Sequence, residues 1–319
     1  MVVNCSDITF VFQGPYYSSA NSKNSTCLAA ESIKHYFPGS PIIFSTWNNP
    51  ENSQFFDKII LNDDPGPGGK YYLDKRKVPD NINRQIISSR NGMLNVQTPY
   101  AVKLRSDIYF TSSNLLSHLR SLEFSNSPYS FCEKKLLTAS NLSCNPLIKN
   151  TFLYHPCDWL TAGLTRDLQN YYTIDLASED HFNYHDDNSI DADCQQPLAS
   201  RFAAEQYILL KNVDKIPYQV SKIENCFDRR ISALKDSIKV LVSNFYMLPS
   251  WQIGFNCYKY RIHYFTSICN HLTLSEYNHL AAKSKKNYSF RHHSDMSIHR
   301  IVNAVVDTYV RPFTNYLKQ

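Results

Sequence analysis

The chain has few glycines and lacks the glycine-rich loops that cradle phosphates. Only 8 of its 319 residues are glycine, and neither a P-loop nor a G-x-G-x-x-G fingerprint is present. These absences disfavour NTP hydrolysis and dinucleotide binding. The formal charge of +5 is spread along the chain instead of forming a concentrated basic face, which disfavours nucleic acid as a partner.

Long apolar runs and paired cysteines are also missing. No run reaches the roughly 18 apolar residues that cross a membrane, and the first residues do not read as a signal peptide. The nine cysteines include no C-x-x-C pair, and their odd number and irregular spacing argue against a disulfide framework and structural zinc. These features predict reduced thiols in a cytoplasmic protein.

Short apolar runs alternate with helical patterns over about the first 110 residues. Apolar, β-branched runs that end in turn residues predict strands over residues 7–12, 41–46, 56–62 and 100–104. Helical spacing predicts helices over 26–36 and 81–96, the second capped by Asn81. This order predicts an α/β protein with a mainly parallel sheet flanked by helices.

The pattern is weaker beyond residue 110. Helices are predicted over 115–122, 158–172 and 197–211, a strand over 238–245, and two or three helices from residue 272. Residues 64–80 and 176–197 read as loops, and the first of these is predicted to be mobile and to order over a bound ligand. The expected organisation is an α/β domain over 1–261 with a helical C-terminal extension over 262–319.

Polar residues follow three of the predicted strands at their carboxyl ends. Gln13 and Gly14 follow the first strand, Asp64 the third, and Arg105 and Asp107 the fourth. Because open α/β sheets bind ligands beyond the carboxyl ends of their strands, we expect these residues to meet at one edge. Gly14 lets the backbone approach a ligand, and Gln13 can hydrogen-bond a base or ribose. An ordinary strand-ending turn is the alternative for this pair.

Three further polar side chains are candidates for the same site. Arg84 and Gln85 open the helix over 81–96, where a guanidinium suits a phosphate, although Arg84 could equally be solvated. Lys103 lies within the strand over 100–104. A lysine inside a strand is costly unless it is paired or faces a cleft, so Lys103 is a candidate as well.

The segment RNGMLNVQTPYAVKLRSDI, residues 90–108, resembles the donor-binding segment of A-type-fold glycosyltransferases. In that group a short strand ends in an Asp-x-Asp pair, and Asp107 falls on the second Asp, which usually ligates the Mn²⁺ or Mg²⁺ that holds the donor diphosphate. Arg105 replaces the first Asp. An arginine cannot ligate a metal but can clamp a phosphate, so the resemblance implies either a divalent cation at Asp107 or an arginine in its place.

Read more widely, residues 7–261 resemble the WavE-type lipopolysaccharide synthesis family. The matching motifs are ITFVFQGP (8–15), FPGSPIIFSTW (37–47), DKIILNDDPG (57–66), INRQIISSRNG (82–92), YAVKLRSD (100–107), YHPCDWLTAGL (154–164), AAEQY (203–207) and SWQIGFNCYKYR (250–261). The resemblance implies an A-type-like glycosyltransferase that moves a sugar from a nucleotide-activated donor to a lipid-linked or growing glycan. Its products would be lipopolysaccharide, O-antigen or capsule.

An inverting sugar transferase needs a carboxylate as general base on the attacking hydroxyl. Asp158 and Glu205 are the two candidates, and the sequence does not rank them. His155 and Trp159 flank Asp158 and are predicted to line the acceptor site, because a sugar offers hydroxyls to polar groups and a C–H face to an aromatic ring. The alternative for Asp158 is a cap on the helix predicted over 158–172.

Asp107 is expected at the rim of the site, close to Asp64. A rim residue tolerates substitution, so Asp107→Asn is predicted to change stability by no more than about ±0.5 kcal/mol. Activity is predicted to fall at least ~100-fold, because a group that organises the donor diphosphate stabilises the transition state.

Two other functions and two other segments remain open. Arg84, Arg105 and Asp107 would also suit a sugar-phosphate transferase, and a non-catalytic assembly scaffold is the third possibility.

The basic residues over 283–291 could dock peripherally on inner-membrane headgroups or form a solvated turn. The His- and Asp-rich stretch over 181–193 resembles a metal cluster, but its irregular spacing favours a solvated loop.

Overall fold

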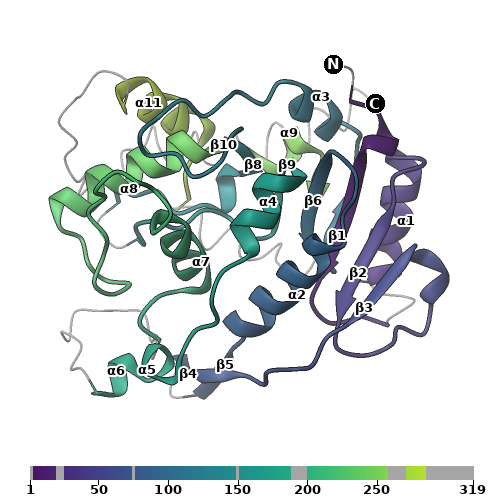
Figure 1. Ribbon diagram of the computed structural model, residues 1–319, viewed down its shortest axis with the longest axis horizontal. Helices are drawn as coiled ribbons and strands as arrows, with labels where there is room; N and C mark the ends of the chain where they lie inside the picture. Colours follow the sequence, from purple (N-terminus) through teal and green to yellow (C-terminus); the bar gives the residue numbers. More distant parts are fainter. Residues whose placement is uncertain are drawn as a thin grey trace.

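A seven-stranded sheet forms the centre of the molecule (Figure 1). The computed structural model describes residues 3–18, 25–73, 76–148, 151–187, 200–257 and 271–284. The strand order is β10-β8-β9-β6-β1-β2-β3. Only β9 is reversed: it pairs antiparallel with β6 and β8, and the other pairings within this sheet are parallel. The predicted mainly parallel α/β sheet is confirmed.

The strands of the sheet are short and mostly apolar. They are β1 (Ile8–Gln13), β2 (Ile42–Thr46), β3 (Lys58–Leu61), β6 (Tyr100–Arg105), β8 (Leu136–Ala139), β9 (Leu160–Leu164) and β10 (Phe245–Leu248). Every residue of β1 and β2 is buried. Such continuous apolar runs are typical of strands covered on both faces.

Helices cover both faces of the sheet. One face carries α2 (Ile82–Leu94), α4 (Thr165–Tyr172), α7 (Ala204–Val213) and α8 (Ile231–Asn244), of which α2, α4 and α7 lie in front of the sheet in Figure 1. The other face carries α1 (Thr26–Tyr36), α3 (Leu115–Arg120), α9 (Ser250–Ile253) and the small sheet of β7 (Tyr109–Phe110) and β11 (Phe255–Asn256). Side chains of β1 alternate between these two cores, with Val11 on the first face and Phe10 and Phe12 on the second.

The remaining elements are short or peripheral. They are three 3₁₀ turns, η1 (Cys5–Asp7), η2 (Ser53–Phe55) and η3 (Ser140–Leu142), the hairpin of β4 (Gly68–Leu73) and β5 (Arg76–Asp80), and the helices α5 (Glu179–Phe182), α6 (Tyr184–Asp187) and α11 (Leu274–Ser284). The α5 helix packs on β4, and α11 packs on α8 and β10. This α11 belongs to the predicted C-terminal helices, whereas the predicted boundary at 261/262 lies outside the described residues.

Several local predictions need correction. The helix expected over 197–211 begins only at Ala204, and the loop expected over 176–197 contains α5 and α6. Residues 64–80 include the β4–β5 hairpin, so they are not a structureless loop; their ordering over a donor stays a prediction. The helix expected over 158–172 begins only at Thr165, because residues 160–164 pair with β6 and β8 as β9. Residues 238–244 belong to α8, with β10 starting at Phe245. Asn81 does not cap α2 with its side chain; the Asp80 carboxylate accepts from the Ile82 amide instead, at 3.0 Å.

The cysteines and the lengths of the helices also bear on predictions made from the sequence. The seven described cysteines are free thiols, as predicted, and Cys194 and Cys269 lie outside the described residues. Among the helices that the structure describes, none is both long enough and apolar enough to span a bilayer.

Glycine at position 92 lets α2 approach β1 closely. A Cβ built on Gly92 would lie 2.4 Å from Val11 Cγ1, far inside a van der Waals contact. Alanine favours a helix by about 1 kcal/mol over glycine, so propensity and packing oppose each other at this position. The close approach matters for the site, because the first turns of α2 reach the carboxyl end of β1.

We predict that Gly92→Ala and Val11→Ala are strongly coupled. Gly92→Ala should destabilise the wild type through overpacking, yet become neutral or stabilising once Val11→Ala has made room. The interaction energy from urea unfolding of the two single variants and the double variant should be about 1–3 kcal/mol. Leu94→Ala, at an exposed position of the same helix, serves as the uncoupled control, and equal effects of Gly92→Ala in both backgrounds would refute the packing argument.

Candidate functional site

A cavity of about 450 Å³ lies at the carboxyl ends of the parallel strands. The sheet changes its winding direction at β1, with β2 and β3 on one side and β6 on the other, and ligands bind at such switch points. The predicted residues that line the cavity are Gln13, Gly14, Asp64, Arg84, Gln85, Arg105, Asp107 and Asp158. The prediction that Gln13 and Asp107 converge on one rim is therefore confirmed.

The floor of the cavity is the paired ends of β1 and β6. Gln13 and Arg105 are register partners, and the Ser106 amide donates to the Gln13 carbonyl at 3.3 Å. Gly14 follows with φ of 112°, a conformation open mainly to glycine, and its amide donates to the Ser45 carbonyl. The Ser88 hydroxyl of α2 lies 3.2 Å from Gln13 Oε1, and it also lies 2.7 Å from the Arg84 carbonyl.

Arg84 of α2 is held over the cavity by Asp64. Its Nε and Nη2 donate to the two carboxylate oxygens of Asp64 at 2.7 and 2.6 Å, and Nη1 donates to Asn81 Oδ1 at 2.9 Å. The hydrogen bonds from Arg84 lower the pKa of Asp64. Both side chains are partly exposed, so this pair orients the guanidinium without contributing much stability.

Arg105 and Asp107 form a second two-point pair, and this one is buried at its acidic end. Arg105 Nε and Nη2 donate to Asp107 Oδ1 and Oδ2 at 3.0 and 2.8 Å, and the guanidinium lies 5.5 Å from the centre of the Trp159 ring. The Asp107 side chain is 1% exposed. Asp107 is therefore not the exposed rim residue that was expected, and each of the two carboxylates is paired with its own arginine. The tolerance of Asp107 to substitution stays a prediction.

Asp158 lines the cavity from the segment before β9, so it does not cap a helix. Gln85 Nε2 donates to its carboxyl oxygen at 3.0 Å. Lys103 is fully buried, and its Nζ donates to the Asp158 backbone carbonyl at 2.5 Å while lying 5.7 Å from the centre of the Tyr172 ring. Lys103 was predicted to bind the donor, but its contacts support the backbone of Asp158 instead. Burial, followed by the charge of Glu205, raises the pKa of Asp158.

Glu205 stands behind Asp158 in an ion pair with His155. Glu205 and Asp158 line the same small void, and His155 Nε2 is 3.3 Å from Glu205 Oε2. Burial alone would raise the pKa of Glu205, but the charge of His155 and the hydrogen bonds to the Glu205 carboxylate together outweigh it and lower the pKa to about 2. Burial alone would lower the pKa of His155, yet Cys144 and Glu205 together raise it well above 6.5. His155 also stacks on Phe152, with ring centres 5.4 Å apart.

The two predicted acceptor residues therefore have other contacts. His155 is paired with Glu205, and Trp159 lies against Arg105. Both stand next to Asp158 without belonging to the lining of the cavity, and a role in acceptor binding stays a prediction.

The carboxylates at the cavity do not form a ligand set for a divalent cation in this arrangement. Both oxygens of Asp107 accept from Arg105, and both oxygens of Asp64 accept from Arg84. Among the described residues, no three His, Cys, Asp or Glu side chains gather closely enough to hold a metal. Part of the His- and Asp-rich stretch, residues 188–193, lies outside the described residues.

Sequence reasoning missed the contribution of β2 to the cavity. Trp47 and Asn48 follow the carboxyl end of β2 and line the cavity together with Tyr17 and Ser106. The rule that pointed to the ends of the other strands applies equally to β2, where Trp47 directly follows the buried strand. An aromatic ring at this place adds a surface on which a planar base could stack.

The fold and the cavity define an α/β protein with a polar cavity at the switch point of its sheet. The chain belongs to the WavE lipopolysaccharide synthesis family, whose family model matches residues 8–306. No curated protein matches the chain. Among solved structures, a cytidylyltransferase from Leptospira borgpetersenii serovar Hardjo-bovis (strain JB197) is similar at 12% identity with a TM-score of 0.31, covering 91% of this chain and 99% of that one. A score this low bears on neither fold nor chemistry.

We predict different stability costs for the two Asp–Arg pairs. Asp107→Asn should destabilise the protein by about 2–3 kcal/mol in urea unfolding, because an amide donor would face the guanidinium of Arg105 in a buried place. Asp64→Asn, the matched control in an exposed pair, should cost about 0–1 kcal/mol. Equal costs for the two variants would show that the burial of Asp107 has no energetic consequence.

The His155–Glu205 pair should stabilise the fold over a defined pH range. The lowered pKa of Glu205 gives stability that is present above 4.5 and is lost as the pH falls towards about 2. The raised pKa of His155 gives stability that is present below 6.5 and is lost as the pH rises through the raised value. The pair therefore stabilises most between pH 4.5 and 6.5.

Glu205→Gln tests this range directly. The difference in Tm between wild type and Glu205→Gln should be largest between pH 4.5 and 6.5 and should shrink at higher pH. Glu31→Gln, at an exposed position of α1, is the control and should follow the wild type throughout. Parallel curves for wild type and Glu205→Gln would contradict the ion pair.

Proposed function

We propose that the protein is a glycosyltransferase of lipopolysaccharide or related surface-glycan synthesis, with its nucleotide-sugar donor bound in the cavity at the end of β1 and β6. One observation carries the proposal: two carboxylate-oriented guanidinium groups, Arg84 and Arg105, and one carboxyl with a raised pKa, Asp158, line the same cavity. Guanidinium groups suit the diphosphate of a donor, and a carboxyl of raised pKa suits a general base.

Different residues of the cavity would contact the diphosphate, the base and the ribose of such a donor. Arg84 uses three of its five N–H groups on Asp64 and Asn81, which leaves two for phosphate oxygens. Trp47 offers a surface for the base, and the backbone at Gly14 allows close approach of the ribose or the first phosphate. Because the carboxylates already orient both guanidinium groups, little side-chain entropy would be lost on binding.

Of the two carboxylates predicted as general base, Asp158 fits better than Glu205. Asp158 lines the cavity, whereas Glu205 is engaged by His155 and keeps a negative charge behind Asp158. That charge raises the pKa of Asp158 and so makes its carboxylate a stronger base. Glu205 is therefore assigned as a positioning residue.

The proposed reaction follows from the positions of Asp158, Arg84 and Arg105 in the cavity. The Asp158 carboxylate takes the proton of an acceptor hydroxyl, and the hydroxyl oxygen forms a bond to the anomeric carbon of the donor sugar. The bond from that carbon to the phosphate oxygen breaks, and the nucleotide leaves with the electron pair. Arg84 and Arg105 stabilise the negative charge that develops on the leaving phosphate.

Donor turnover on a glycan acceptor tests the proposal against its alternatives. A glycosyltransferase releases nucleoside mono- or diphosphate and moves only the sugar. A sugar-phosphate transferase moves sugar and phosphate together, and an assembly scaffold turns over no donor at all. The lipid-linked acceptor, cytoplasmic location and peripheral membrane contact belong to the proposal, and most of the basic segment over 283–291 lies outside the described residues.

Asp158→Asn should abolish activity without harming the fold. Loss of the base should lower kcat by about 100-fold or more. The Tm should stay level or rise at high pH, because a raised pKa means that ionised Asp158 costs stability and Asn cannot ionise. Wild-type activity should rise with pH as Asp158 loses its proton. Asp63→Asn, an exposed neighbour of the cavity, is the control, and full activity of folded Asp158→Asn would exclude Asp158 as base.

The arginines, and not a metal, are proposed to hold the diphosphate. Chelator should then leave activity unchanged, and Arg105→Gln should lower kcat/KM by about 100-fold, a loss typical of an oriented group that stabilises developing charge. Silencing of the wild type by chelator, with rescue by Mn²⁺, would favour the divalent cation instead.

A further inference from the structure

A second and larger cavity, about 680 Å³, lies away from the first one. Its walls come from α5, α6, α7 and the segment around Lys222. It shares no lining residue with the cavity at the end of β1. The α7 helix serves both regions, because Glu205 reaches towards Asp158 while Tyr207 and Lys211 line the second cavity.

Arg201 is held rigidly in the wall of this cavity. Its guanidinium lies between the rings of Tyr184 and Phe202, 5.1 and 5.2 Å from their centres. Its Nε donates to the Glu224 carbonyl at 2.6 Å. Within the described residues, this is the one hydrogen bond that the Arg201 guanidinium donates, so its two terminal nitrogens remain available for a ligand.

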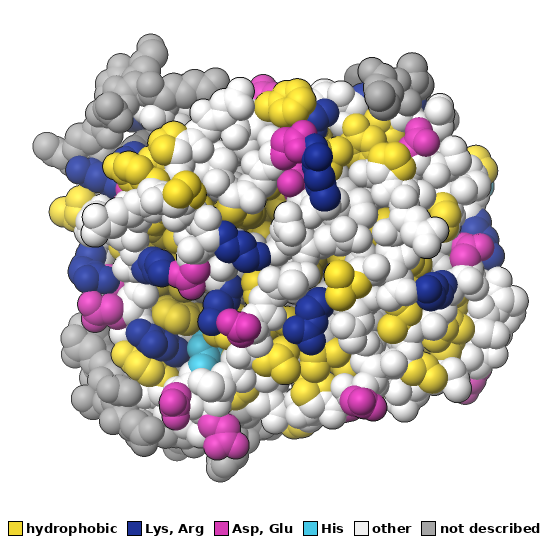
Figure 2. All heavy atoms as spheres, in the orientation of Figure 1, with side chains coloured by type: hydrophobic (Ala, Val, Ile, Leu, Met, Phe, Trp, Pro, Cys, Tyr) yellow, Lys and Arg dark blue, Asp and Glu magenta, His cyan; other side chains and the backbone are white. Residues whose placement is uncertain are grey.

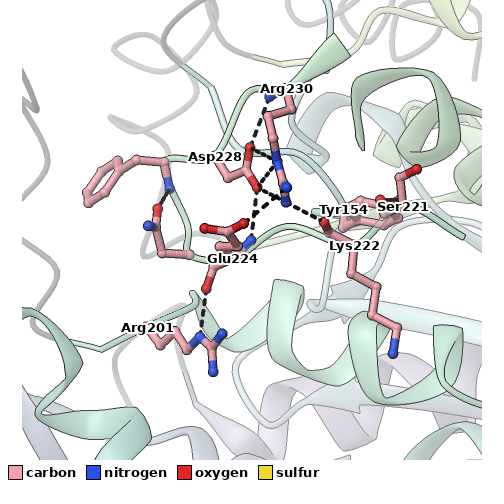
Figure 3. Close-up of polar contacts among 9 residues, drawn as sticks. Tyr154, Arg201, Ser221, Lys222, Glu224, Asp228 and Arg230 are labelled. Carbon is pink, nitrogen blue, oxygen red and sulfur yellow. Dashed lines mark hydrogen bonds and ion pairs between the residues drawn. The ribbon is translucent and has the colours of Figure 1, made fainter. Parts of the chain in front are cut away.

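A network around Arg230 holds the segment that positions Arg201 (Figure 3). Arg230 Nη2 donates to Asp228 at 2.7 Å and to the Lys222 carbonyl at 3.0 Å, and Nη1 is 3.0 Å from Glu224 Oε1. The Glu224 amide in turn donates to Asp228 at 2.9 Å. Figure 3 places Arg201 below this network, joined to it through Glu224. The wall is thus preformed, which lowers the entropic cost of binding.

The rest of the lining combines cations, carboxylates and aromatic rings. Lys211 lies over the Tyr207 ring and only 3.6 Å from a highly exposed Asp175, and Lys222 is paired with Asp214. The lining holds three cations, Arg201, Lys211 and Lys222, and two carboxylates, Asp180 and Asp214. In Figure 2, Lys and Arg side chains gather with carboxylates around a His at the lower left, in the region of α5 and α7.

A buried histidine adds an unused polar atom to this wall. His181 is 6% exposed, and its Nε2 has no hydrogen-bond partner among the described residues. Its ring packs on Tyr207, with ring centres 4.8 Å apart. A buried nitrogen without a partner is costly unless something fills its hydrogen-bonding capacity.

We propose that this second cavity binds an anionic saccharide, one that carries a phosphate or a carboxylate, through the terminal nitrogens of Arg201 and the ammonium of Lys211. The aromatic rings would contact the C–H face of the sugar, and Asp180 and Asp214 would accept from its hydroxyls. The cavity thereby holds a charged unit of the glycan acceptor. That acceptor role rests on the proposed sugar transfer, whereas the binding chemistry does not.

Isothermal titration calorimetry with glucose 6-phosphate, glucuronate and neutral glucose tests this site. At least one anionic sugar should bind the wild-type protein, and Arg201→Gln should weaken it by at least about tenfold, as expected for loss of a charge-assisted contact. Glucose should bind much more weakly than its anionic forms. The anion that binds identifies the charged group as phosphate or carboxylate.

Two further variants separate this site from the donor cavity and from misfolding. Lys211→Gln, at a partly exposed position, should weaken the same sugar at least about threefold with an unchanged Tm, so the test does not depend on Arg201→Gln folding. Arg84→Gln should leave this binding unchanged. Binding that depends on Arg84 instead of Arg201 and Lys211, or no binding of either anionic sugar, would overturn the proposal. Loss of donor turnover alone would overturn only the sugar-transfer function.

Discussion

The pairing of β1 with β6 is the constraint on which the site depends. It brings Gln13 beside Arg105 at the point where the sheet changes direction, and the turns that follow carry Gly14 and Asp107 to the same edge. Because β3 runs parallel to these strands, Asp64 arrives at this edge too. The close packing of Gly92 on Val11 then sets how near α2, with Arg84 and Gln85, comes to the strand ends.

Beneath the cavity, the protein buries a lysine ammonium and an ion pair. The ammonium of Lys103 is fully buried, and desolvation lowers its pKa despite the opposing charge of Asp158. The His155–Glu205 pair adds a second buried charge couple behind Asp158. Replacing a whole buried pair by apolar side chains is often neutral, whereas removing one partner alone is strongly destabilising. The physical effect of these buried charges is on Asp158, whose backbone Lys103 supports and whose pKa Glu205 raises.

Much of the fold and most of the cavity lining could be predicted from the sequence, because both follow local patterns. The helix Thr26–Tyr36 was predicted to the residue, and the strand ends pointed to five of the lining residues, Gln13, Gly14, Asp64, Arg105 and Asp107. The errors arose where tertiary contacts decide whether a segment forms a helix or a strand. The β-branched run at the end of α8 reads as a strand, yet Leu234, Ile238 and Leu241 lie on one helical face that packs into the core.

Contacts that the sequence pattern does not reveal, one of them local and two of them long-range, explain the remaining differences. Asp107 looked exposed because a strand-ending Asp is usually solvated, and only the structure shows Arg105 folded back onto both of its oxygens. Likewise, Lys103 and His155 looked like ligand-binding groups. Their partners, the Asp158 carbonyl and Glu205, lie about 50 residues further along the chain in each case.

We propose that the cavity at the end of β1 and β6 binds a nucleotide-activated sugar through Arg84. The most direct measurement is the thermal shift of wild type and Arg84→Gln with a panel of uridine, guanosine, cytidine and thymidine nucleotide sugars. A ligand that binds only the folded state stabilises it and so raises Tm, more strongly as the ratio of ligand concentration to Kd increases. We expect that at least one nucleotide sugar raises the wild-type Tm and has little effect on Arg84→Gln. Equal shifts in both proteins, or none in the wild type, would contradict it.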